Sequence, residues 1–259
     1  MVRSLIHKSL RALGFDIVSV QNLNQELANR ELARQNAALE EFRRLSTLTK
    51  IAPATMHGEM VWVDRDHLVS EAVRRMLPAD VVLDIGCAFR PQKYIEARTH
   101  ICCEPFKEYM DRLLFETSGS TKYVYLDADF SSATKLFPNA SVDSIFMVDV
   151  IEHIHRSVGK IGLDKLKRIA RSQVIIFTPL GFMDQNPSED GVDPWGMGGA
   201  KWQQHQSGWE PDDFPLSDGW TVIACKDFHL TDGYGNSLEK PAGAFWAIWN
   251  APATQQAKV

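Results

Sequence analysis

Acidic side chains recur in the middle of the chain, each at the end of an apolar run that has the composition of a buried strand. Because the carboxyl ends of parallel strands meet at one edge of a sheet, such acids would gather there and face a bound ligand. A carboxylate at that edge could hold a ligand by accepting its hydroxyl or amino hydrogens. The candidates are Asp84, Glu104, Asp127, Asp129 and Asp149.

The run VVLDIGCAFRP, residues 81–91, breaks at Gly86, which is followed by Cys87 and Ala88. An apolar run that ends in a glycine turn is typical of a strand that leads into a ligand-binding loop. Dinucleotide-binding turns use two or three glycines, because a pyrophosphate must lie against the backbone at a helix N-terminus. The single glycine therefore disfavours NAD.

Two histidines are candidates for acid–base chemistry. His153 lies four residues after Asp149, and His205 lies in a long irregular segment. A histidine has the pKa that suits a general base for an alcohol, although each of these could equally make a structural hydrogen bond. The histidine and cysteine spacings match no metal motif, and we expect no metal site. A divalent-ion site made of Asp149, Asp184 and Asn186 is a minor alternative.

From about residue 60, strand-like and helix-like segments alternate, which predicts a parallel sheet with helices on both faces. A long irregular stretch then precedes two strands, 219–228 and 243–251, whose spacing predicts an antiparallel hairpin at the edge of the sheet. The earlier strands are expected at 81–85, 100–104, 122–127, 142–150 and 173–179, and helices at 64–77, 93–97, 105–115 and 164–170.

These segments together resemble the class I S-adenosylmethionine-dependent methyltransferases over roughly residues 60–250. The resemblance lies in four motifs in the order of that family: LDIGCAFRP, CCEPF, LDADF, and MVDVIEHI at 147–154. It implies an α/β fold with a doubly wound, mostly parallel seven-stranded sheet of the Rossmann-like kind, and S-adenosyl-L-methionine as the cofactor. Ala88 stands where the family more often has glycine, which puts the strength of cofactor binding in doubt.

The resemblance also implies roles for individual residues. Glu104 would accept the ribose hydroxyls, either Asp127 or Asp129 would accept from the adenine amino group, and Asp84 would organise the turn. An acid at a strand end can equally be a structural cap, so each role taken singly is open. The complete implied cofactor site is Asp84, Gly86, Cys87, Glu104, Asp127, Asp129 and Asp149, with His153 and His205 as the catalytic candidates.

Residues 181–214 form an unusually long segment without the pattern of a helix or strand, and such segments are often lids or substrate-binding loops. Its tryptophans could stack on a sugar or pack in the core. SGWEPDDF also resembles a segment of family members encoded with bacterial surface-polysaccharide genes, which implies a glycan or glycolipid precursor as the acceptor. The substrate-binding candidates are Trp195, Trp202 and Trp209.

Residues 1–58 are predicted to form an N-terminal helical extension to a methyltransferase domain at 59–259. Residues 2–14 have the spacing of a basic amphipathic helix, which could contact an anionic membrane surface or pack on protein. Residues 21–50 lack glycine and proline, and a homodimer through 21–48 is an open alternative because the heptad pattern is short.

The composition restricts the class of protein. A net charge of −5 over 259 residues disfavours nucleic acid as a partner, and four cysteines without C-x-x-C spacing suggest neither a disulfide framework nor a zinc knuckle. We expect a cytoplasmic protein, with peripheral contact to the inner face of the membrane as an alternative. The predicted function is O-methylation of a small polar acceptor such as a sugar. The competing hypothesis is a non-catalytic scaffold, in which the N-terminal helices tether a degenerate methyltransferase domain to a membrane or a partner.

Overall fold

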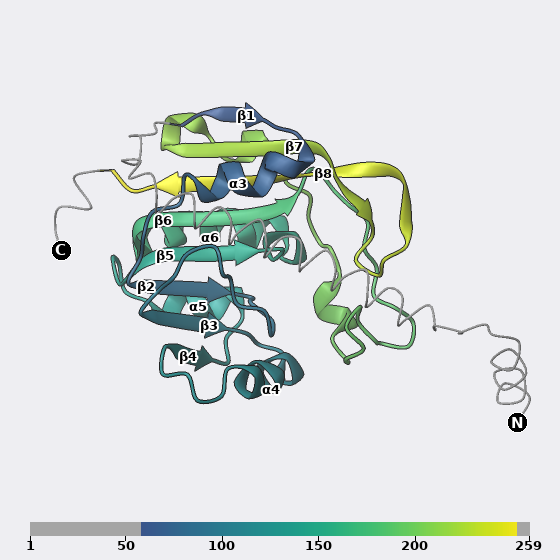
Figure 1. Cartoon of the computed structure of the whole chain (residues 1–259), viewed down its shortest axis with the longest axis horizontal. Coiled ribbons are helices and arrows are strands. Elements are labelled where there is room, and N and C mark those ends of the chain that lie inside the picture. Colours follow the sequence, from purple (N-terminus) through teal and green to yellow (C-terminus); the bar gives the residue numbers. More distant parts are fainter. Residues whose placement is uncertain (1–57, 253–259) are drawn as a thin grey trace, which may run out of the picture. The chain divides into compact units, whose positions relative to one another are not determined.

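The computed structural model describes residues 58–252 (Figure 1). The predicted amphipathic helix at 2–14 and the predicted long helix at 21–50 lie outside these residues, and with them the predicted membrane and dimer contacts. In the described part, no helix has the length and apolarity needed to cross a membrane.

The described residues form one eight-stranded sheet in the order β1-β7-β8-β6-β5-β2-β3-β4. Neighbouring strands are parallel except where β8 pairs with β6 and with β7. The strands are β1 (Met60–Trp62), β2 (Val81–Ile85), β3 (Thr99–Cys103), β4 (Tyr123–Leu126), β5 (Val142–Val148), β6 (Ala170–Pro179), β7 (Trp220–Thr231) and β8 (Ser237–Asn250).

The predicted doubly wound, mostly parallel sheet is confirmed, but the expected number of seven strands was wrong. The short strand β1, which the sequence did not reveal, pairs in parallel with β7. The β7–β8 hairpin is therefore not the outer edge, and β8 lies inside the sheet between β6 and β7. Burial explains this position, since the segment from Gly243 to Trp249 is almost entirely buried, as expected of a strand flanked on both sides.

The winding of the sheet reverses at β2. From β2 the chain adds β3 and β4 on one side, and it then returns to add β5 and β6 on the other side. In open α/β sheets, ligands bind outside the carboxyl ends of the strands at such a switch point. The carboxyl ends of β2, β3 and β5 are therefore the place where a ligand is expected, and the segment after β6 lies at the same edge (Figure 1).

Helices cover both faces of the sheet, as predicted. Helices α5 (Phe130–Leu136) and α6 (Arg156–Ile169) contact each other on the face that carries Leu83 and Cys103. Helix α4 (Lys107–Glu116) packs over Cys102 on the opposite face. The helix expected at 64–77 is shorter than predicted and consists of η1 (Arg65–His67) and α3 (Leu68–Val73).

The helix predicted at 93–97 was wrong, because the chain from β2 to β3 is a loop. Its backbone hydrogen bonds are made by the Gln92 side chain, which accepts from the amides of Tyr94 and Ile95 and donates to the Ile95 carbonyl. The ring of Tyr94 stacks on Phe146 of β5 and meets Trp246 of β8 edge-on. Aromatic packing and the Gln92 amide thus replace the helix that usually covers this part of such a sheet.

Candidate functional site

The turn after β2 is tightly folded. Gly86 has a φ of +69°, and a Cβ at this position would lie 2.8 Å from a methyl carbon of Val150. Only glycine therefore fits without displacing Val150, which follows the neighbouring strand β5. Ala88 has a φ of +48°, a left-handed conformation that costs an L-residue about 1–2 kcal/mol. This explains physically why glycine would be favoured at Ala88, and it means that the turn forms in spite of some strain.

Asp84 is buried and its carboxylate is used within the protein. Its Oδ2 atom accepts from the amide of Gln92 at 2.7 Å and lies 3.0 Å from Nε2 of the buried His100 in β3. The side chain therefore organises the loop after β2 and fastens β2 to β3. His100 was not expected to take part, because nothing in the sequence reveals a partner sixteen residues away.

Glu104 follows β3 and lies beside the turn. Its Oε2 atom accepts from the amide of Ala88 at 2.9 Å, and its Oε1 atom accepts from the amide of Phe106 at 2.8 Å. Burial raises the pKa of Glu104 to about 7 against the opposing effect of these two hydrogen bonds, and the charge of Asp127 raises it further. Because each carboxylate oxygen has two lone pairs, Glu104 can still accept one hydrogen bond at each oxygen.

The two acids after β4 have different roles. Asp129 is the N-cap of α5, and its Oδ1 atom accepts from the amide of Ser132 at 2.7 Å. Asp127 is exposed and lies close enough to Glu104 to raise the pKa of that carboxyl group. The capping contact accounts for Asp129, so Asp127 is the acid of this pair that remains for a ligand.

The predicted role of Cys87 needs correction. Its side chain is buried in a cluster with Phe89, Cys102, Tyr109 and Leu113. A hydrogen bond with Cys102, and then burial, raises the pKa of the thiol well above its ordinary value. The side chain is thus part of the core, and only the backbone of Cys87 could contact a ligand.

Asp149 lies at the end of β5 in a left-handed conformation, with a φ of +53°. The residue is exposed to solvent, yet burial by the surrounding protein, and then the charge of Glu152, raises its pKa well above the ordinary value. The carboxyl group of Asp149 is thus accessible, although the surrounding protein disfavours its ionised form. Half-buried Tyr94 lies near it, and its pKa is raised by burial and then by Asp149 and Asp84.

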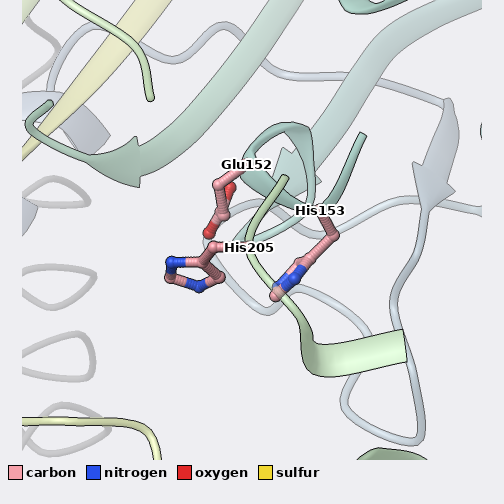
Figure 2. Close-up of side chains that lie close together, drawn as sticks. All are labelled: Glu152, His153 and His205. Carbon is pink, nitrogen blue, oxygen red and sulfur yellow. The ribbon is translucent and has the colours of Figure 1, made fainter. Parts of the chain in front are cut away.

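Three further side chains meet just beyond Asp149. Glu152 and His153 lie in η2 (Ile151–His153), and His205 comes from the long segment after β6. Their candidate ligand atoms all lie within 4.8 Å of one another, and Figure 2 shows the side chains projecting into the same space. The two imidazole rings are 4.8 Å apart between centroids. The sequence singled out both histidines separately but missed Glu152.

Hydrogen bonds fix the orientation of this cluster. Ring atom Nδ1 of His153 lies 3.1 Å from the Gln204 carbonyl, and Nδ1 of His205 lies 2.5 Å from the Met183 carbonyl. Burial lowers the pKa of His153, and burial followed by the neighbouring His153 lowers that of His205 to about 4. Both imidazoles are therefore neutral near pH 7.

The segment that carries His205 is firmly attached to η2. The amides of Gln206 and Ser207 both donate to the Glu152 carbonyl, at 2.7 and 3.0 Å. Arg156 donates through Nη1 to the Gly208 carbonyl, and its Nη2 atom donates to both carboxylate oxygens of Asp213, at 2.7 Å to each. The motif SGWEPDDF therefore has a structural role, which is to hold His205 beside His153.

The three tryptophans of the long segment differ in their surroundings. Trp209 is fully buried, and its indole nitrogen donates to Ser207 Oγ at 2.8 Å and to the Ile151 carbonyl. The prediction that it binds substrate was wrong, because the ring belongs to the main hydrophobic core. Half-buried Trp195 packs edge-on against Phe89, whereas Trp202 is 45% exposed.

Buried Asp193 organises the first part of the same segment. It accepts hydrogen bonds from the amides of Trp195, Met197 and Gly199, and from the Tyr109 hydroxyl of α4 at 2.6 Å. Sequence analysis missed Asp193. The signal that could have identified it is the run DPWG, in which Asp, Pro and Gly together indicate a turn built on the Asp side chain.

No family model matches the sequence, and no curated protein matches it either. Solved structures with a similar fold include the N-methyltransferase NodS from Bradyrhizobium japonicum (10% identity, 71% of this chain and 92% of that chain, TM-score 0.47). Magnesium protoporphyrin IX methyltransferase ChlM from Synechocystis, with bound SAM, matches at 8% identity over 94% of this chain and 90% of that one, with a TM-score of 0.46. TehB from Haemophilus influenzae matches at 15% identity over 70% and 61%, with a TM-score of 0.48. Because these identities and TM-scores are low, we assign the fold from the strand order of the chain itself.

Proposed function

We propose that the carboxyl edge of β2, β3 and β5 binds a ligand that contains a nucleoside. The particular function that we infer is methyl transfer from S-adenosyl-L-methionine to an oxygen of a small polar acceptor. The observation that carries the proposal is Glu104. This buried acid lies at the switch point of the sheet, and each of its two oxygens keeps one lone pair for a ribose hydroxyl.

The loop after β2 favours this cofactor over a dinucleotide. In a dinucleotide-binding fold, the pyrophosphate binds at the N-terminus of the helix that follows the strand equivalent to β2. Here the segment that follows β2 is a loop. S-adenosyl-L-methionine carries no phosphate and needs no such helix. Glu104 would hold the ribose and Asp127 the adenine amino group, while Asp84 supports the turn from below. The cofactor would supply a methyl group that is already activated on a sulfonium.

The acceptor would lie beyond Asp149, at the cluster of Glu152, His153 and His205. A neutral imidazole can take the proton of an acceptor hydroxyl and pass it to solvent. His153 is the better base of the two, because a pKa of about 4 makes His205 a weak proton acceptor. Holding the hydroxyl close to the methyl donor would account for much of the rate.

A sugar, such as that of a glycan or glycolipid precursor, is the acceptor class that we propose. Its support is the exposed ring of Trp202 and the half-buried ring of Trp195 in the segment over the strand ends, because aromatic faces suit the apolar side of a sugar. The motif SGWEPDDF adds no support, since its contacts hold the segment in place.

Calorimetric titration with S-adenosyl-L-methionine, and separately with NAD, tests the cofactor. We expect the wild-type protein to bind the first in the micromolar range and the second not at all. Glu104→Ala should weaken binding by about 100-fold, since hydrogen bonds to a charged group contribute about 1.5–3 kcal/mol each. The control is Glu116→Ala, which removes an exposed acid of α4 that forms an ion pair with Arg112.

Two outcomes would contradict the proposal. If the wild-type protein binds NAD and not S-adenosyl-L-methionine, the assignment is wrong. If it binds neither, the strained turn at Ala88 does not hold a ligand, and the non-catalytic scaffold becomes the better hypothesis.

A further inference from the structure

The cluster after β5 has the composition of a metal site. It unites a carboxylate and two imidazoles from segments about fifty residues apart, with all three candidate ligand atoms within 4.8 Å of one another (Figure 2). A cation bonded at about 2.1 Å to each ligand needs those atoms to lie about 3–4 Å apart. Side-chain adjustments of about 1 Å would close the cluster around an ion, which is a small change for histidine and glutamate.

The hydrogen bonds of the imidazoles prepare both rings for a metal. The partners of Nδ1 are the backbone carbonyls of Gln204 and Met183, which can only accept, so Nδ1 must carry the proton in both rings. The lone pair of each ring then resides on Nε2. Metal-binding histidines almost always donate their other ring nitrogen to a carbonyl or carboxylate in this way, and this fixes the tautomer.

Glu152 is prepared in the same way. Its Oε2 atom accepts from Thr178 Oγ1 at 3.0 Å. The side chain is buried, and no lysine or arginine of the described residues forms an ion pair with it. Buried carboxylates in proteins are usually paired with a cation or coordinate a metal.

One more unpaired group lies nearby. The Nε2 atom of His229 in β7 is buried and has no hydrogen-bond partner among the described residues. The His229 ring packs against Phe177 of β6, and the next residue, Thr178, donates to Glu152. The unpaired ring nitrogen therefore lies in the same part of the structure as the cluster.

We propose that Glu152, His153 and His205 bind a divalent transition-metal cation whose remaining positions take an oxygen of the acceptor. Two imidazoles and a carboxylate suit Zn²⁺, Mn²⁺, Fe²⁺ or Co²⁺, whereas Mg²⁺ and Ca²⁺ prefer oxygen ligands alone. Three protein ligands leave coordination positions open. In this arrangement the imidazoles are ligands rather than bases.

The cluster lies where the acceptor would bind in the proposed methyltransferase site. The role of the cation in binding the acceptor oxygen rests on that proposed function. Val150, two residues before Glu152, packs against Gly86 of the turn after β2. The cation would thus lie near the turn at Gly86, where we propose that the cofactor binds. A cation lowers the pKa of a hydroxyl that it binds, and so makes the oxygen a better nucleophile at neutral pH.

Cobalt titration of the full chain, after removal of metals with a chelator, tests the site. We expect wild-type protein to bind one equivalent of Co²⁺ with visible absorption bands, and Zn²⁺ to displace it. His153→Ala, His205→Ala and Glu152→Gln should each weaken binding by at least about 10–100-fold, the loss seen even for groups that only support a ligand. The control is His155→Ala, which removes an exposed imidazole that hydrogen-bonds Ser157 and should leave binding unchanged.

Sodium azide tests the open position, because an anion that joins the ion will shift the cobalt bands. Absence of a shift would mean a closed structural site and would contradict the role in acceptor binding. Absence of stoichiometric cobalt binding, or an equal loss in His155→Ala, would overturn the site itself.

The two proposals can fail separately. S-adenosyl-L-methionine affinity should be unchanged in His205→Ala, and cobalt binding should be unchanged in Glu104→Ala. Cobalt binding without any affinity for S-adenosyl-L-methionine would overturn the methyltransferase function and leave the metal site standing. Affinity for the methyl donor without cobalt binding would overturn the metal site and return the histidines to the role of base.

Discussion

The turn after β2 and the cluster after β5 both lie at the carboxyl edge of the sheet, yet they are assembled over very different distances in the sequence. Glu104 accepts hydrogen bonds from the amides of Ala88 and Phe106, and these three residues all lie within twenty residues of Gly86. His205 meets Glu152 and His153 only because residues 204–213 return across about fifty residues to η2. Local motifs therefore reveal the first region, whereas tertiary contacts create the second.

The comparison also separates the two parts of the long segment 181–214. The part around Trp209 is core, with its indole hydrogen bonds satisfied and its carbonyl bonded to the amide of Gly181. The part around Asp193 is attached to α4 through the Tyr109 hydroxyl, which donates to Asp193, and through Glu108, which accepts from the amide of Gly198. The two halves are thus held by different contacts, and the second half belongs to the framework.

The largest expected effect tests that division. Trp209→Ala should lower the free energy of unfolding by about 3–5 kcal/mol, because it removes a fully buried ring. Trp202→Ala, at a position that is 45% exposed in the same segment, should change it by no more than about 0.5 kcal/mol. Urea denaturation measures both. Equal costs for the two variants would show that Trp209 is not part of the framework.

Asp193→Ala should release the first half of the segment, since four hydrogen bonds to one carboxylate are lost together. We expect hydrogen exchange of residues 183–203 to accelerate by at least about tenfold, the equivalent of one hydrogen bond to a charged group. Exchange in β2 and β3 should not change. Asp190→Ala, an exposed acid in the same segment, is the control, and similar acceleration in both variants would remove Asp193 from its organising role.

The pKa of Glu104 gives a pH-dependent prediction for the region of the turn. A carboxyl group whose pKa is raised to about 7 stays protonated in the folded protein where the unfolded chain is ionised, so its contribution to stability falls as pH rises from about 4.5 to 7. The ionised form accepts hydrogen bonds at both oxygens and more strongly than the protonated form, which must donate through one of them. Affinity for S-adenosyl-L-methionine should therefore increase by up to about tenfold from pH 6 to pH 8.

The control for this experiment is Glu104→Gln, which keeps the shape of the side chain and cannot ionise. Its affinity should be weaker and should follow only the titration of the ligand's own amino group. A wild-type profile that is identical to that of Glu104→Gln would show that Glu104 does not contact the ligand as a carboxylate.

The smallest effect concerns the left-handed residues. Ala88→Gly should stabilise the fold by about 0.5–1 kcal/mol, as the relief of strain exceeds the extra entropy of glycine in the unfolded chain. Ala140→Gly, with a φ of +51° in the loop before β5, should stabilise similarly. Thermal unfolding measures both, and only Ala88→Gly should also tighten S-adenosyl-L-methionine binding. Equal effects on binding would separate Ala88 from the site.

Much of the framework follows from local pattern alone. The alternation of apolar runs with amphipathic segments predicted the parallel order of β2 to β6, because each buried strand needs a continuous apolar sequence. The pattern failed at 93–97, where Gln92 satisfies the backbone of a loop that reads as a helix. It also failed at β1, since three residues that pair with β7 at one edge carry no periodic signal.

The sequence by itself determined which side chains end the strands, and so it located Glu104, Asp84 and the turn at Gly86. Only the tertiary structure decided what those side chains do: Asp129 caps a helix, Cys87 and Trp209 enter the core, and Glu152 joins two histidines. The physical reason is the range of the interactions. Strand propensity and turn geometry act over a few neighbouring residues, whereas burial and the meeting of η2 with residues 204–213 depend on how distant segments pack.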